Sequence, residues 1–156
     1  NVRKDVIDAF ATDCARKLGY RAGTDLEPIV KHLGGHISYQ SLDDVARNEA
    51  SIRVDGPNQF EIFLPDHTSW ERDRFSIAHE LGHYFLHFPL KKEPMVAQRF
   101  GSNRVEWEAN WFAAGFLMPK EEFAAQFEKC ELTEVAQHFG VSVAAAEARA
   151  RALSLR

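Results

Sequence analysis

The sequence predicts an α+β fold, in which a small antiparallel sheet packs on one central helix and a C-terminal helical segment follows. Three observations predict it: long segments with helical apolar spacing, three short segments with strand character, and a run of short helices after Pro119. The length of 156 residues favours one domain with a small appendage. We expect residues 1–119 to form the main domain and residues 120–156 to pack on it as a helical segment.

The first third of the chain predicts two helices that precede the sheet. Val2–Leu18 keeps apolar residues at helical spacing, and Gly19 fits its end. Thr24 fits the N-cap of a second helix, with Glu27 at the capping-box position. Gly34 and Gly35 then end this helix near Leu33.

Three strands are expected next, over 36–40, 52–54 and 60–64, with a turn at 55–58 between the last two. An extended substrate can pair its backbone with an exposed strand edge. The strand that carries Phe60, Ile62 and Leu64 directly precedes the central helix, so it is the candidate edge. A purely structural hairpin is the alternative, and the pattern leaves both open.

The central helix is predicted to begin at Thr68, as N-cap of a capping box with Glu71, and to end before Pro89. It contains His79-Glu80-Leu81-Gly82-His83. Two histidines four residues apart lie on one face of a helix, where both can bind one zinc ion at roughly 2.0–2.1 Å. The intervening Glu80 can then take a proton from a zinc-activated water. This pattern indicates a hydrolase, most often a peptidase.

A catalytic zinc usually has three protein ligands, so this site needs one besides the two histidines. His87 lies eight residues after His79, about 12 Å further along a continuous helix. No glycine between His83 and His87 lets the chain turn back, as it does in the metzincin pattern. We therefore expect His87 to lie behind the ligands or at the helix end. A histidine in such a position is more often a surface residue than a metal ligand.

The next predicted helix, over 105–118, offers better candidates. Glu106 and Asn110 lie one turn apart on one face, so Glu106 can bind the metal while Asn110 hydrogen-bonds a ligand histidine from behind. Glu108 is the second candidate ligand. The alternative is that both glutamates are ordinary surface carboxylates, and spacing alone does not decide between these readings.

These residues resemble the ImmA/IrrE metallopeptidases. The similarity rests on Ala78–His83 and on Glu106–Ala114 followed by Leu117-Met118-Pro119, and extends from about Asp5 to Leu153. The resemblance implies a zincin-like fold and a gluzincin-like peptidase. It implies one Zn²⁺ per chain, or Mn²⁺ or another divalent ion in vivo, bound by His79, His83 and Glu106, with Glu80 as the catalytic carboxylate.

The resemblance also implies a substrate class. Members of this family typically act on helix-turn-helix repressors and so relieve repression, in mobile elements and in stress responses. The rival hypothesis is a non-catalytic, zinc-stabilised regulator that binds a partner protein, or a toxin or antitoxin component. Glu80 weighs against it, because a structural zinc site has no need of that carboxylate.

The oxyanion formed during peptide hydrolysis needs a donor besides the metal. The sequence offers Tyr39, His67, Tyr84 and His87 and does not choose among them. Tyr84 directly follows a ligand on the helix, points away from the ligand face, and is the weakest candidate.

The last 25 residues predict a helix, Gly140, and a second helix, which resembles a helix-turn-helix. Residues 129–156 carry four basic and three acidic side chains, and the second helix is rich in alanine. Both features favour packing or partner binding over DNA binding.

Composition excludes several classes of protein. The net charge of −4 disfavours a polyanion-binding protein, and the two cysteines, Cys14 and Cys130, do not form a disulfide framework. No apolar run approaches the roughly 20 residues that span a bilayer, and no signal peptide is apparent, so the cytoplasm is the expected compartment.

Overall fold

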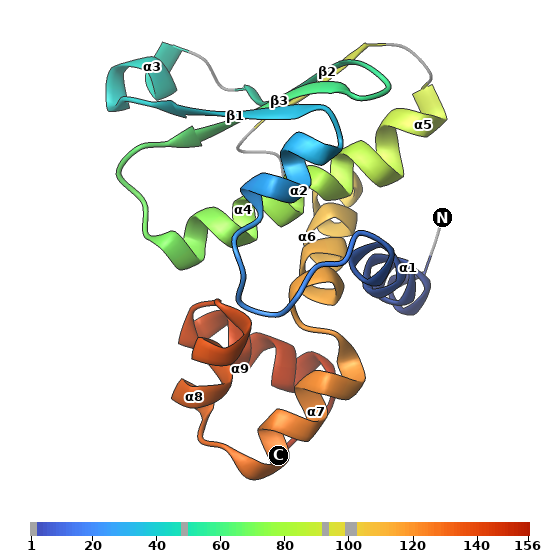
Figure 1. The fold of residues 1–156 in the computed structure, drawn as a ribbon, viewed down its shortest axis with the longest axis vertical. Coiled ribbons are helices and arrows are strands. Elements are labelled where there is room, and N and C mark those ends of the chain that lie inside the picture. Colours follow the sequence, from blue (N-terminus) through green and yellow to red (C-terminus); the bar gives the residue numbers. More distant parts are fainter. Residues whose placement is uncertain (1–2, 48–49, 92–93, 99–102) are drawn as a thin grey trace.

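The computed structural model describes residues 3–47, 50–91, 94–98 and 103–156. It has a four-stranded sheet and helices, which confirms the predicted α+β class (Figure 1). The strands are β1 (Gly35–Gln40), β2 (Ala50–Gly56), β3 (Gln59–Pro65) and β4 (Met95–Gln98). The helices are α1 (Lys4–Lys17), α2 (Glu27–His32), α3 (Leu42–Arg47), α4 (Trp70–Gly82), α5 (Phe88–Lys91), α6 (Arg104–Leu117), α7 (Lys120–Lys129), α8 (Leu132–Phe139) and α9 (Val143–Ala152).

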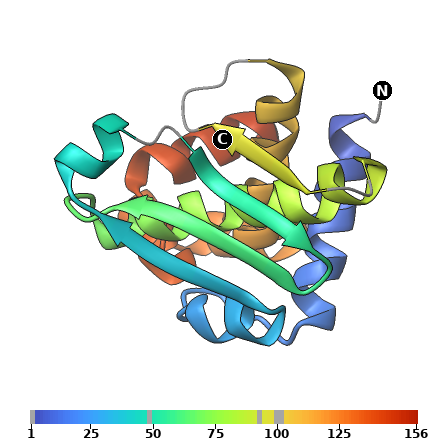
Figure 2. The ribbon, with the colours of Figure 1, turned by 90° about the horizontal axis from the view of Figure 1, so that it is seen from above.

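The sheet has the strand order β1-β3-β2-β4 (Figure 2). β2 pairs antiparallel with β3 and with β4, but β1 pairs parallel with β3. The expectation of a purely antiparallel sheet is therefore wrong. β3 lies between β1 and β2 in the sheet. It follows β2 through a hairpin, so β3 runs opposite to β2 and in the same direction as β1.

The strand predicted to offer an edge to substrate is an inner strand, and that prediction is wrong. β3 is hydrogen-bonded to β1 on one side and to β2 on the other. The side chains of Phe60, Ile62 and Leu64 are buried in the core. In the described part of the chain, the outer strands are β1 and β4.

The central helix α4 lies beneath the sheet (Figure 1). Its N-cap is Ser69, whose side chain accepts from the main-chain N–H of Arg72, so the helix begins one residue later than a Thr68 cap implies. The helical path also continues past Pro89. A π-helical turn, His83–His87, follows α4 and leads directly into α5, whose second residue is Pro89.

Helix α6 crosses beneath α4 and also packs on α1 (Figure 1). Two glycines permit these approaches. A Cβ at Gly82 would lie 3.1 Å from Cα of Ala109, and one at Gly115 would lie 2.7 Å from the main-chain oxygen of Asp8. Gly115 therefore marks the place where α1 contacts α6, and the helix continues through it.

Helices α7, α8 and α9 pack at the end of α6, and two buried arginines tie them to the rest. Arg74 of α4 donates from Nε to the main-chain oxygen of Gly140 at 2.9 Å, where α8 ends in a left-handed residue. Arg149 of α9 forms a bidentate ion pair with Asp8 of α1. The hydrophobic core is continuous from α1 through the sheet to Phe123 and Phe139.

Two short elements, α3 and β4, had no sequence prediction, and the second helix differs at its start. α2 begins at Glu27, whose main-chain N–H donates to Asp25 Oδ1 at 3.0 Å, and the hydroxyl of Thr24 instead donates to the main-chain oxygen of Arg21. Within the described ranges, no helix combines the length and apolar character needed to cross a bilayer.

Candidate metal centre and active site

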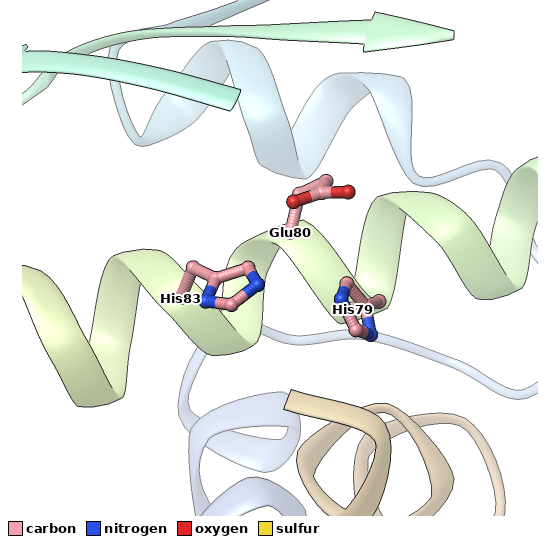
Figure 3. A group of neighbouring side chains, drawn as sticks. All are labelled: His79, Glu80 and His83. Carbon is pink, nitrogen blue, oxygen red and sulfur yellow. The ribbon is translucent and has the colours of Figure 1, made fainter. Parts of the chain in front are cut away.

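Helix α4 presents His79 and His83 one turn apart, with Glu80 on the side that faces the strands (Figure 3). His83 is the first residue of the π-helical turn and its side chain is fully buried. One ligand atom from each of His79, Glu80 and His83 lies within 4.8 Å of the others. The spacing predicted from the sequence therefore brings these three side chains together.

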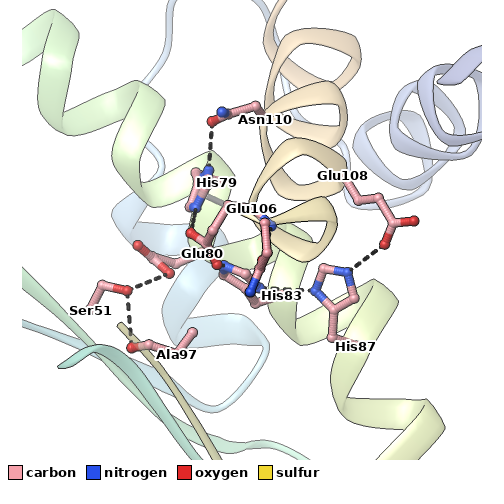
Figure 4. Close-up of polar contacts among 10 residues, drawn as sticks. Ser51, His79, Glu80, His83, His87, Ala97, Glu106, Glu108 and Asn110 are labelled. Carbon is pink, nitrogen blue, oxygen red and sulfur yellow. Dashed lines mark hydrogen bonds and ion pairs between the residues drawn. The ribbon is translucent and has the colours of Figure 1, made fainter. Parts of the chain in front are cut away.

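Helix α6 brings a carboxylate to the two histidines (Figure 4). Glu106 Oε1 lies 3.0 Å from His79 Nε2, and Glu106 Oε2 lies 3.0 Å from His83 Nε2. Asn103 caps this helix by accepting from the main-chain N–H of Glu106 at 3.2 Å. The close approach of α4 and α6 at Gly82 thus places Glu106 between both rings.

The opposite nitrogen of each ring is held by another side chain. His79 Nδ1 lies 2.8 Å from Asn110 Oδ1, as the spacing of Asn110 after Glu106 predicted. His83 Nδ1 lies 2.9 Å from His87 Nδ1. In both histidines, Nδ1 is engaged from behind and Nε2 faces the carboxylate, which is the orientation that outer-shell hydrogen bonds give to metal ligands.

The charges of this cluster are coupled. Burial raises the pKa of Glu106, but its contacts with His79 and His83 outweigh burial and lower the pKa to about 2. Burial lowers the pKa of His79, yet its hydrogen bond to Glu106 and the nearby Glu80 leave that pKa raised overall. Burial dominates at His83 and lowers its pKa, so this ring favours the neutral form that binds a metal.

Glu80 lies beside the histidines at an open cleft of about 430 Å³. Its Oε1 is 3.2 Å from Ser51 Oγ, and the same hydroxyl lies 3.2 Å from the main-chain oxygen of Ala97 on β4 (Figure 4). The cleft has both apolar and polar lining, from Leu42, Val45, Phe63, Leu64, Pro65, His67, Thr68, Arg72, Phe75, Ser76 and Asn110. Glu80 therefore borders a cleft that opens to solvent.

Two of the residues considered as ligands, His87 and Glu108, do not face the Nε2 atoms of His79 and His83. His87 is 7% exposed, so the surface reading is wrong, and its Nε2 lies 2.9 Å from Glu108 Oε1. Glu108, the second candidate ligand, contacts His87 and Arg104 and not the ligand nitrogens of His79 or His83. Tyr84 points to the β2–β3 turn, where its hydroxyl accepts from the main-chain N–H of Asn58 at 2.9 Å.

Sequence reasoning missed Ser51 as a partner of Glu80. A serine in a short strand carries no local signal, and only the pairing of β2 beside β4 brings it over the helix.

Of the four residues considered as oxyanion donors, His67 alone lines the cleft within the described ranges. Tyr39 lies on β1 with an exposed side chain.

A comparison with protein-family models found a match, and a comparison with curated proteins found none. The matching family model is Peptidase_M78, described as the IrrE N-terminal-like domain, and it covers residues 31–151. These residues include the whole sheet, α4, α6 and the side chains gathered around Glu106. The match confirms the resemblance stated from the motifs, and the chain belongs to the Peptidase_M78 family.

Proposed function

We propose that this protein is a zinc-dependent endopeptidase whose metal is held by His79, His83 and Glu106. The observation that carries the proposal is the convergence of two histidine Nε2 atoms on one carboxylate, each at 3.0 Å, beside Glu80 at an open cleft. Membership of a peptidase family supports the reaction class.

The residues present fit a catalytic zinc site. Two histidines and one glutamate form a donor set that catalytic zinc takes, with one position left for water. His83 Nε2 is buried and makes no hydrogen bond of acceptable geometry with any residue in the described ranges, although the Glu106 carboxylate lies 3.0 Å away. A buried nitrogen without a hydrogen bond costs free energy that a bound cation would recover.

Glu80 is the proton carrier in this proposal. A zinc ion bound at the site would supply a Lewis acid that polarises the peptide carbonyl and acidifies water. Glu80, only 5% exposed, accepts the proton of the attacking water and delivers it to the leaving amine. The Ser51 hydroxyl has one hydrogen and two neighbouring acceptors, so it donates to Glu80 while that carboxylate is ionised and can turn to Ala97 once Glu80 is protonated.

His67 is the proposed donor to the developing oxyanion. It lines the cleft with Glu80 and His79, and its imidazole is half exposed, so a bound peptide can reach it. His87 is unsuited to this role, because both of its ring nitrogens already face other side chains.

A helix-turn-helix repressor is the proposed substrate. This part of the proposal rests on the resemblance to the ImmA/IrrE metallopeptidases. The cleft supports a protein substrate in general terms, since it is open and offers the apolar side chains of Leu42, Phe63 and Phe75 near Glu80. An extended segment with a large apolar residue next to the scissile bond fits this lining.

The test uses catalytic amounts of the zinc-loaded protein with a purified candidate helix-turn-helix repressor. Wild type is expected to convert the repressor into discrete fragments, and Glu80→Gln to retain zinc while producing none. A lower limit of about 100-fold loss follows from removing the general base. If the repressor stays intact after prolonged incubation with wild type, the proposed substrate is wrong. If both proteins cleave it equally, the role of Glu80 is wrong.

A further inference from the structure

We propose that Glu108, acting through His87, sets the proton position on His83 and thereby keeps the metal-facing nitrogen of His83 unprotonated. This inference deepens the proposed function and rests on it. Glu108 and His87 are positioning residues here, since neither reaches the cleft: they form a file that starts at α6 and ends at the buried side of His83 (Figure 4).

The file consists of three side chains from two elements. His83 Nδ1 lies 2.9 Å from His87 Nδ1, and His87 Nε2 lies 2.9 Å from Glu108 Oε1. His83 and His87 are the first and last residues of the π-helical turn, and their ring centroids are 5.0 Å apart. The side chains of His83 and His87 are 0% and 8% exposed, so water does not compete for these hydrogen bonds.

Arg104 holds the carboxylate of Glu108 at the charged end of the file, and Trp111 packs against Arg104. Glu108 Oε2 accepts from Arg104 Nε at 3.1 Å, and the Arg104 guanidinium lies 4.8 Å from the centroid of the Trp111 ring. The Arg104 guanidinium pairs with Glu108 as an ion pair, which requires the ionised form of the carboxylate. An ionised carboxylate can only accept hydrogen bonds.

Counting protons along the file gives one arrangement for neutral rings. Because Glu108 only accepts, His87 Nε2 must carry the hydrogen of that contact. A neutral imidazole has one N–H, so His87 Nδ1 is a bare acceptor. His83 Nδ1 must then carry the hydrogen that it donates to His87. The lone pair of His83 Nε2 then faces the Glu106 carboxylate at 3.0 Å, and a cation bound between these two acceptors satisfies both.

The competing arrangement shows what Glu108 prevents. If His87 donated from Nδ1 to His83, then His83 would carry its own hydrogen on Nε2, where it would oppose a cation. That arrangement leaves His87 Nε2 bare against the Glu108 carboxylate, so two acceptors would face each other at 2.9 Å in a buried place. The carboxylate thus selects the tautomer of a ring that it does not touch.

His87 variants separate this role from simple packing. His87→Leu removes the acceptor behind His83 and is expected to weaken zinc binding by about 10- to 100-fold, the usual range for loss of an outer-shell partner. His87→Gln offers a carbonyl oxygen to His83 and an amide N–H to Glu108, so it is expected to restore most of the affinity. The affinity is measured by competition with a chromogenic chelator, which requires no substrate.

The matched control is His138→Leu. His138 Nε2 also lies near a carboxylate, 3.2 Å from Glu122 Oε1, but this pair is exposed on α8 and α7, away from the site. His138→Leu is expected to leave the zinc affinity unchanged. Equal affinity of wild type and a folded His87→Leu, or failure of His87→Gln to exceed His87→Leu, would overturn the inference while leaving the proposed peptidase function intact.

A direct readout needs no variant at all. Long-range ¹H–¹⁵N NMR correlations of the zinc-loaded wild type distinguish the two tautomers of each ring. A bond from His83 Nε2 to zinc itself requires the hydrogen of that ring on Nδ1, so His87 is the informative ring. We expect its hydrogen on Nε2, towards Glu108. A hydrogen on Nδ1 of His87 would overturn the inference even if His87→Leu did not fold. A wild type that binds no zinc would instead refute the metal site on which both proposals rest.

Discussion

The side-chain oxygen of Asn110 on α6 lies 2.8 Å from Nδ1 of His79 on α4. The same helix carries Glu106 one turn earlier, 3.0 Å from the other nitrogen of that ring. One face of α6 therefore holds both sides of the His79 imidazole, and the orientation of the ring depends on how α6 packs against α4.

Removal of the Asn110 acceptor is expected to loosen this ring. Asn110→Leu leaves His79 Nδ1 without its partner, so we expect zinc affinity to fall by about 10-fold or more with little change in folding. Asn110→Asp keeps an acceptor at the same place and is expected to bind zinc nearly as well as wild type. Isothermal titration of the two metal-free variants with zinc measures the difference, and equal affinities would contradict this role for Asn110.

The close helix packing at Gly82 is expected to be sensitive to a single methyl group. Gly82→Ala places a Cβ 3.1 Å from Cα of Ala109 and from Cβ of Phe112, so α6 must move away and take Glu106 with it. We expect a loss of about 1–3 kcal/mol of stability together with weaker zinc binding. Gly56→Ala is the control, because its Cβ would meet nothing closer than 4.0 Å. Urea unfolding that ranks Gly82→Ala with Gly56→Ala would refute the packing argument.

Arg74 is expected to contribute strongly to stability although it is a charged residue. It is 2% exposed, donates to the main-chain oxygens of Gly140 and Thr24 and to the hydroxyl of Tyr20, and joins α4 to two distant segments. Arg74→Met leaves the buried main-chain oxygen of Gly140 without its donor and removes the bonds to Thr24 and Tyr20, which we expect to cost about 2–4 kcal/mol.

The control for this variant is Arg72→Met, on the exposed side of the same helix. Surface substitutions of this kind usually change stability by less than about 0.5 kcal/mol. Thermal unfolding of both variants measures the contrast, and similar melting temperatures for the two would show that Arg74 does not hold the C-terminal helices in place.

The metal-free protein is expected to have a pH-dependent stability that Glu106 controls. The contacts of Glu106 outweigh its burial and lower its pKa from 4.5 to about 2, so its contribution is complete above pH 4.5 and is lost as the pH falls towards 2. The pKa of His79 is raised from 6.5, so its contribution is complete below pH 6.5 and is lost as the pH rises.

The contribution of this pair is therefore largest between pH 4.5 and 6.5. Glu106→Gln removes the charge of this carboxylate. It should therefore remove the pH dependence that the pair gives to the free energy of unfolding. The difference in unfolding free energy between metal-free wild type and Glu106→Gln, followed across pH, measures it. A difference that does not change with pH would contradict the coupling.

The sequence predicts the parts of this structure that depend on local pattern. Apolar spacing predicted α1 and α6 and the start of α4 to within a few residues, and the separation of His79 and His83 by one turn follows from their spacing of four residues. Asn110 also lies where helical spacing from Glu106 predicted. These features follow from the helical repeat, which needs no knowledge of the rest of the chain.

The features that depend on distant segments were not predicted. The parallel pairing of β1 with β3 and the four-residue edge strand β4 depend on strand order, which local pattern does not encode. The burial of His87 depends on a π-helical turn and on Glu108 from another helix. Ser51 is the same kind of case, because only the assembled sheet brings its hydroxyl to Glu80.

The central claim is that a single metal ion is bound by residues of two helices, and anomalous diffraction at the zinc absorption edge tests it most directly. Crystals of the zinc-loaded wild type should show one strong peak bonded to His79 Nε2, His83 Nε2 and the Glu106 carboxylate, with solvent in the remaining position. Density elsewhere on the protein, or a fourth side chain closing the coordination sphere, would contradict a catalytic zinc centre at this site.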